Sequence, residues 1–110
     1  MRQVFAVACA AAALLVAAAP AAARVRLVNL TSPTYPGAYA TLTAQVSPTA
    51  TCSIAVYYKS GASRAQGLYP KRGARISWTW KVGTRTTPGR WGIVVSCGSA
   101  GTLRTSFVVT

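Results

Sequence analysis

Apolar and polar side chains alternate through most of the chain, in short runs separated by clusters of Pro, Gly, Ser and Thr. A period of two residues places alternate side chains on opposite faces of an extended strand. No stretch after residue 23 keeps the period of about 3.6 residues that an amphipathic helix requires. Short strands with frequent turn residues are typical of two packed antiparallel sheets. The sequence therefore predicts an all-β fold of the sandwich type.

Six strands follow from this alternation, and residues 60–70 are expected to form loops or a weak edge strand, giving about seven strands in all. The six expected strands are 25–30, 39–46, 52–59, 76–82, 91–97 and 102–109. The expected turns and connections are 32–37, 47–49, 72–75, 87–89 and 98–101.

One face of each run is apolar enough to contribute to a core. Ile76, Trp78, Trp80 and Val82 share one phase of their run, so both indoles are predicted to be buried. Trp91 is likewise in phase with the apolar side of its own run. We therefore expect the tryptophans to belong to the core rather than to form a platform for carbohydrate.

The N-terminus has the three parts of a secretory signal peptide. Arg2 precedes an apolar run from Val4 to Ala19, and Pro20 and a small-residue stretch follow it. Cleavage after Ala23 leaves one domain, 24–110, without stable membrane insertion. The alternatives are an uncleaved membrane anchor and a lipoprotein signal that uses Cys9. The Ala-rich signal is typical of bacteria, and a secreted location, extracellular or periplasmic, is expected.

Two cysteines, Cys52 and Cys97, remain after cleavage. An even pair in an exported chain predicts a disulfide bond, and two cysteines allow only one pairing. The expected strands that carry them run in opposite directions, so the bond forms if these strands are neighbours. It would close a loop of about 46 residues and contribute roughly 4 kcal/mol to stability.

The charge balance is one-sided, with twelve Lys and Arg and neither Asp, Glu nor His. One interpretation is that the charge only keeps an exported protein in solution. The other is attraction to an anionic envelope polymer, a phospholipid head group or nucleic acid. Basic and aromatic residues interleave in one candidate polyanion-binding patch, which consists of Tyr57, Lys59, Arg64, Tyr69, Lys71, Arg72 and Arg75. The alternative is a solvated rim of loops.

Charge reversal of Lys71, Arg72 and Arg75 is expected to weaken polyanion binding more than reversal of Arg26. The reason is that Arg26 is predicted to lie on the opposite sheet.

The lack of carboxylate and imidazole side chains excludes most catalytic and metal-binding arrangements. Paired-acid glycosidases, Ser-His-Asp triads and the common Zn, Ca and Mg sites all need these groups. No cofactor, no metal and no small-molecule substrate are therefore expected, and the chain is predicted not to be an enzyme. The one remaining candidate, Lys59 beside Tyr57 and Tyr58, is more simply a strand-end lysine over an aromatic ring.

Several strings within residues 32–108, read together, resemble the immunoglobulin-like modules of exported bacterial proteins. They are SPTYPG, ATLTAQVSPTATCSIAVYYKSG, LYPK, SWTWKVGTRTTPG, WGIVVSCG and TLRTSFVV. The resemblance implies an immunoglobulin-like antiparallel β-sandwich that acts as a non-catalytic structural or interaction module of the cell surface or exterior. Its partner would be a protein or an anionic polymer of the cell envelope. Unlike antibody domains, the chain places its first cysteine on the third expected strand.

Overall fold

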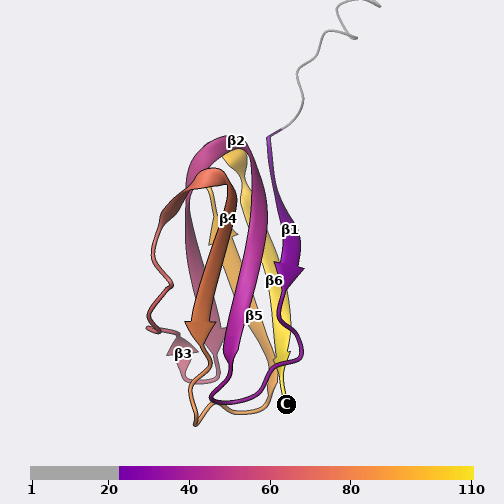
Figure 1. The fold of residues 1–110 in the computed structure, drawn as a ribbon, viewed down its shortest axis with the longest axis vertical. Coiled ribbons are helices and arrows are strands. Elements are labelled where there is room, and N and C mark those ends of the chain that lie inside the picture. Colours follow the sequence, from indigo (N-terminus) through magenta and orange to yellow (C-terminus); the bar gives the residue numbers. More distant parts are fainter. Residues whose placement is uncertain (1–22) are drawn as a thin grey trace, which may run out of the picture.

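The computed structural model describes residues 23–110, which form an all-β fold (Figure 1). The predicted signal peptide lies outside the described residues except for Ala23. The strands are β1 (Arg24–Leu30), β2 (Tyr39–Tyr58), β3 (Gly61–Ala62), β4 (Lys71–Lys81), β5 (Gly89–Ser96) and β6 (Thr102–Val109). A short 3-10 turn, η1 (Gly98–Ala100), lies in the hairpin between β5 and β6, where the sequence predicts a loop.

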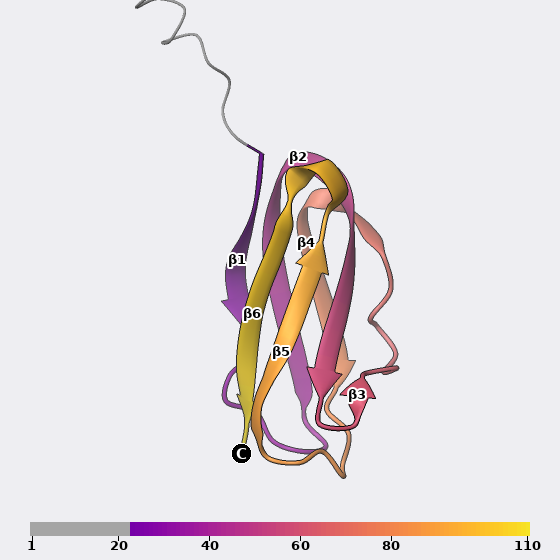
Figure 2. The same ribbon diagram turned by 180° about the vertical axis from the view of Figure 1, so that it is seen from behind.

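Strand β2 organises the sheet because its 20 residues pair with four other strands. The first part of β2 lies between β1 and β4, and its last part lies between β5 and β3. All these pairings are antiparallel, and β6 continues the sheet beyond β5. Figures 1 and 2 show β2 arching over at one end of the molecule, so that the sheet curls around its own interior.

The turn predicted at residues 47–49 is wrong, because these residues lie within β2. The pairing of β2 with β4 shifts register between Gln45 and Ala50, and it resumes opposite Gly73. Pro48 lies in this gap. Proline has no backbone N–H to donate, and at this position β4 requires no hydrogen bond from β2. A proline that looks like a chain reversal in the sequence therefore marks a bend in one long strand.

The connection predicted at residues 72–75 is also wrong, because these residues belong to β4. Gly73 and Arg72 pair with Ala50 and Thr51, on the far side of the bend in β2. Strand β4 thus extends about five residues further toward the N-terminus than its apolar alternation indicates. Pairing with a distant strand, rather than local composition, decides its start.

The core consists of the apolar faces that the alternation predicts. On β2, the side chains of Ala40, Leu42, Ala44 and Val46 are all buried. Trp78 and Trp80 on β4 have no exposed surface, which confirms their predicted burial. The remaining buried apolar residues are Cys52, Val56, Ile76, Val82, Ile93, Val95, Cys97, Ala100, Phe107 and Val109.

The indole N–H groups find acceptors within the fold. Trp78 donates to the Tyr69 carbonyl oxygen at 2.8 Å, and Trp80 donates to the Tyr58 hydroxyl at 3.1 Å. The Trp80 ring also meets Phe107 of β6 edge to face, with the ring centroids 5.9 Å apart. Large aromatic residues can be buried here because their one polar group is satisfied. Trp91 is only partly buried.

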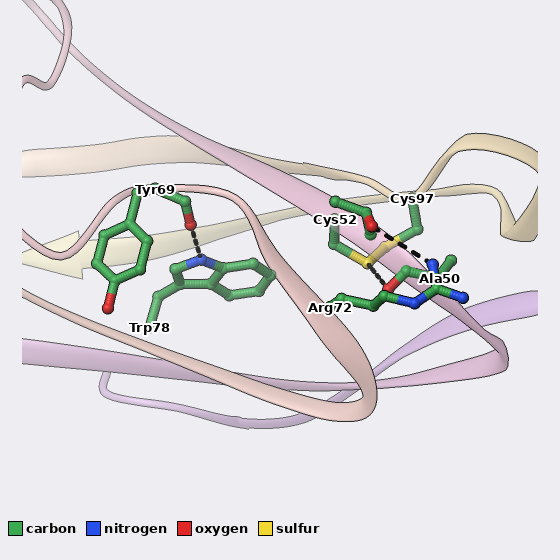
Figure 3. The surroundings of a disulfide bond; sticks show 7 residues. Ala50, Cys52, Tyr69, Arg72, Trp78 and Cys97 are labelled. Carbon is green, nitrogen blue, oxygen red and sulfur yellow. Dashed lines mark hydrogen bonds between the residues drawn. A yellow bond between two sulfur atoms is a disulfide. The ribbon is translucent and has the colours of Figure 1, made fainter.

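The predicted disulfide between Cys52 and Cys97 is confirmed (Figure 3). Ser53 of β2 is directly opposite Ser96 of β5, so the cysteines occupy the next pair of positions in the same ladder. The strands are antiparallel neighbours, as the prediction requires. The bond therefore joins two adjacent strands just where β2 leaves its bend.

The N-terminal segment closes the curl of the sheet. After β1 leaves β2, Thr34 forms an isolated parallel bridge with Val109 of β6. The Thr34 N–H donates to the Val108 carbonyl, and the Thr110 N–H donates to the Thr34 carbonyl, both at 2.8 Å. The N-terminal segment thereby pairs with β2 through β1 and with β6 through Thr34. Strands β1 and β6 lie side by side in both views (Figures 1 and 2).

Candidate polyanion-binding surface

A direct contact joins two of the predicted patch residues, Lys71 and Tyr69. The Lys71 ammonium nitrogen lies 5.1 Å from the centroid of the Tyr69 ring. It also donates a hydrogen bond of 2.7 Å to the Ser77 carbonyl oxygen. The Tyr69 carbonyl in turn accepts the Trp78 indole N–H (Figure 3). These contacts fix the course of the segment that leads into β4.

The other predicted patch residues fall into two groups. Tyr57, Lys59 and Arg64 lie around the pairing of β2 with β3, whereas Arg72 and Arg75 lie on β4. Tyr57 is opposite Gly92 in the ladder of β2 with β5. Arg72 lies beside Thr51, and its Nη1 is 3.4 Å from the Thr51 hydroxyl. Six residues of extended strand separate Thr51 from Tyr57, which is about 20 Å at 3.3 Å per residue.

Lys59 follows the end of β2, at the end of the molecule away from the bend, and Arg64 is exposed between β3 and β4. The prediction of one patch rests on the interleaving of basic and aromatic residues in the sequence, with residues 72–75 expected to form a connection. Strand β4 instead carries them to the bent end of the fold.

A different set of cations lies together on the outer face of the sheet formed by β1, β2 and β4. Arg26 is opposite Gln45, and Gln45 is opposite Arg75, so the three side chains form one row across three strands. The Arg26 Nη2 donates to the Gln45 Oε1 at 3.2 Å. Arg24 is opposite Ser47, two residues along β1 from Arg26 and therefore on the same face of the sheet. We call Arg24, Arg26 and Arg75 the arginine face.

The prediction that Arg26 lies on the opposite sheet from Arg75 is wrong. Both residues flank Gln45 in the same sheet, and both are exposed. Alternation places residue 26 in the first expected strand, but residue 75 is expected in a connection and residue 24 just before a strand. Alternation also does not predict that β1 and β4 pair with the same stretch of β2, which is what places Arg26 and Arg75 in one row.

A band of hydroxyl groups continues this face away from the arginines. The Thr43 and Ser77 hydroxyl oxygens are 2.7 Å apart, and those of Thr41 and Thr79 are 2.8 Å apart. Each pair bridges β2 and β4 at directly opposite positions. Hydroxyl groups both donate and accept hydrogen bonds, so the band can contact phosphate or sugar oxygens next to the arginines.

No side chain of this protein neutralises the positive charge of the arginine face. Guanidinium groups stay protonated in proteins, and the sequence supplies no side-chain carboxylate to pair with them. Their planar fork fits the oxygens of phosphate or carboxylate groups. A hollow of about 160 Å³ is lined by Arg24, Arg26, Gln45 and Ser47, which gives one anionic group a place between the side chains.

Tyr58 is the one described group whose titration departs clearly from its ordinary range. Burial raises the pKa of the Tyr58 hydroxyl, and the hydrogen bond from Trp80 opposes part of this rise in the pKa. A raised pKa keeps the phenol neutral at physiological pH. Tyr58 is therefore a neutral, partly buried hydrogen-bonding residue at the edge of the core, and it does not form an ion pair with the adjacent Lys59.

Among residues 23–110, no group of three or more Cys, His, Asp or Glu side chains gathers as a metal site would require. No helix within that same range is long and apolar enough to span a membrane. Comparison with known protein families finds no family that matches the chain. Comparison with curated proteins likewise finds no match.

Proposed function

We propose that the chain is an exported, non-catalytic interaction module whose immunoglobulin-like sandwich binds anionic polymers of the cell exterior. The arginine face is the single observation that carries this proposal, since three arginine residues occupy neighbouring positions on one sheet face and the chain has no side-chain carboxylate to pair with them. Phosphate-rich polymers are attracted to such a face by charge and held by bidentate hydrogen bonds.

One feature supports the sandwich, and two support the export. The part of the sheet built from β1, β2 and β4 packs its apolar face toward the part built from β5 and β6, as the contact of Trp80 with Phe107 illustrates. The N-terminal sequence pattern is that of a signal peptide. A disulfide bond such as Cys52–Cys97 persists in oxidising compartments outside the cytosol.

Reversal of two charges on the arginine face tests the proposal. The double variant Arg26→Glu/Arg75→Glu is expected to bind a fluorescently labelled single-stranded oligonucleotide at least about tenfold more weakly than the wild type at low salt. With roughly three phosphate contacts, the wild-type log affinity should fall against log salt with a slope of about −2, and the variant slope should be shallower. Fluorescence anisotropy over a salt series measures both quantities.

The matched control is Arg90→Glu/Arg104→Glu, which makes the same change in net charge on β5 and β6. Both control arginines are exposed, so neither variant opens the core. The proposal requires the control to lose much less affinity than the arginine-face variant. Equal losses would show that only net charge attracts the polymer, and the basic surface would then serve solubility.

A further inference from the structure

The turn that follows β2 and the loop that follows β4 lie at the end of the molecule opposite the bend in β2 (Figure 1). Residues of these two segments line a pocket. Its volume is about 530 Å³, which falls within the roughly 300–1,000 Å³ of known ligand pockets. The residues that line it are Tyr58, Lys59, Ser60, Gly83, Arg85, Thr86 and Thr87. None of them belongs to the arginine face.

Backbone hydrogen bonds hold both walls of this pocket in place. On the side of β4, the Thr86 N–H donates to the Gly83 carbonyl at 3.1 Å and closes a turn that contains Arg85. The residue before that turn, Val82, exchanges two bonds of 2.8 Å with the segment that precedes β2. On the other side, the Ser63 N–H donates to the Val56 carbonyl at 2.7 Å. The segments that line the pocket are therefore ordered before a ligand binds, which lowers the conformational entropy lost on binding.

The polar groups of the pocket are mostly donors. Lys59 has three N–H donors and no acceptor, and Arg85 has five N–H donors and no acceptor. The hydroxyls of Ser60, Thr86 and Thr87 add one donor each. The Tyr58 hydroxyl already accepts the Trp80 indole N–H, so its own proton is free to donate. Every charge that lines the pocket is positive, and the chain offers no carboxylate side chain to neutralise them.

A phosphate monoester fits this set of donors better than a carboxylate does. It presents three terminal oxygens and nearly two negative charges at neutral pH, against two oxygens and one charge for a carboxylate. The two cations can then share one ligand group without leaving either unpaired. The volume also exceeds what a phosphate group alone would fill, and the hydroxyl groups offer hydrogen bonds to a polar body of the size of one sugar.

We propose that the pocket between Lys59 and Arg85 is a binding site for a phosphorylated sugar. The phosphate group contacts Lys59 and Arg85, and the sugar hydroxyls contact Ser60, Thr86 and Thr87. This site is separate from the arginine face, and it would exist even if the arginine face bound no polymer.

Isothermal titration calorimetry of the purified, disulfide-bonded protein with glucose 6-phosphate tests the site at physiological salt. Glucose 6-phosphate is expected to bind, and to bind at least about tenfold more tightly than inorganic phosphate, glucuronate or glucose. Lys59→Ala and Arg85→Ala should each weaken its binding at least about tenfold, since each removes a charge-assisted hydrogen bond. Both residues are exposed, and an unchanged thermal unfolding curve verifies the fold of each variant.

Arg104→Ala is the matched control, because it removes one exposed arginine from β6, a strand that contributes no residue to the pocket. Its affinity for glucose 6-phosphate should equal that of the wild type. The proposal is overturned if the control loses as much affinity as Arg85→Ala, if inorganic phosphate binds as tightly as the sugar phosphate, or if no binding occurs at millimolar ligand. Unchanged binding by Arg26→Glu/Arg75→Glu separates this site from the arginine face.

Discussion

Replacement of Trp80 by alanine should lower the free energy of unfolding by about 3–5 kcal/mol, the range found for large aromatic residues removed from cores. The indole has no exposed surface, and it touches Phe107 across the interior of the curled sheet. Its loss leaves a cavity between β4 and β6 and also frees the Tyr58 hydroxyl, which accepts the indole N–H. Urea unfolding followed by circular dichroism, with the disulfide intact, measures the change.

The control for Trp80→Ala is Tyr39→Ala. Tyr39 is an aromatic residue of the same β2–β4 ladder, opposite Lys81 in the pair next to that of Trp80, and 66% of its surface is exposed. Its removal should cost less than about 1 kcal/mol, as is usual for surface positions. If Trp80→Ala cost no more than Tyr39→Ala, the indole would not be buried in the protein, and it would be available as a platform for a ligand.

Removal of the disulfide by Cys52→Ala/Cys97→Ala should lower the free energy of unfolding by about 2–5 kcal/mol. The two cysteines are 45 positions apart in the sequence, so the bond strongly restricts the unfolded chain. Small domains have total stabilities near the lower end of about 5–15 kcal/mol, so the variant should be partly unfolded at 37 °C. Thermal unfolding of the variant, and of the wild type with and without reductant, measures the effect.

Alanine is chosen because both cysteines are fully buried among apolar neighbours, where serine would add an unsatisfied hydroxyl group. Thiol labelling of the unfolded, non-reduced protein gives an independent check on Cys52 and Cys97. Neither cysteine should react, and both should react after reduction. Labelling of both before reduction, or an unfolding free energy that changes by less than about 1 kcal/mol in the variant, would contradict a stabilising bond.

The buried faces were predictable from the sequence because strand alternation is a local property. Trp78 and Trp80 lie in the core as their phase with Ile76 and Val82 indicates. The ends of the strands were less predictable. Pro48 reads as a turn residue, and Gly73 among three cations reads as a loop, although both lie within strands. In each case the pairing between β2 and β4 outweighs the local propensity.

The candidate site was predictable only in its chemistry. The absence of acidic residues predicts a surface open to anions, and this holds for any fold of the chain. Proximity in sequence suggested that Lys71, Arg72 and Arg75 lie with Lys59 and Tyr57. The structure instead places Arg75 and Arg26 on either side of Gln45, although they are 49 positions apart in the sequence. Contacts between strands so far apart depend on the order of the sheet, which alternation does not specify.

The most direct measurement of polymer binding by the arginine face is a residue-resolved NMR titration with inorganic polyphosphate. Backbone amides are followed in isotope-labelled, disulfide-bonded protein as the polymer is added at low and then at physiological salt. The proposed function predicts that the largest shift changes fall on Arg24, Arg26, Gln45 and Arg75, reach saturation, and weaken together as salt increases. Changes spread evenly over the exposed cations of all strands, Arg90 and Arg104 included, would contradict it.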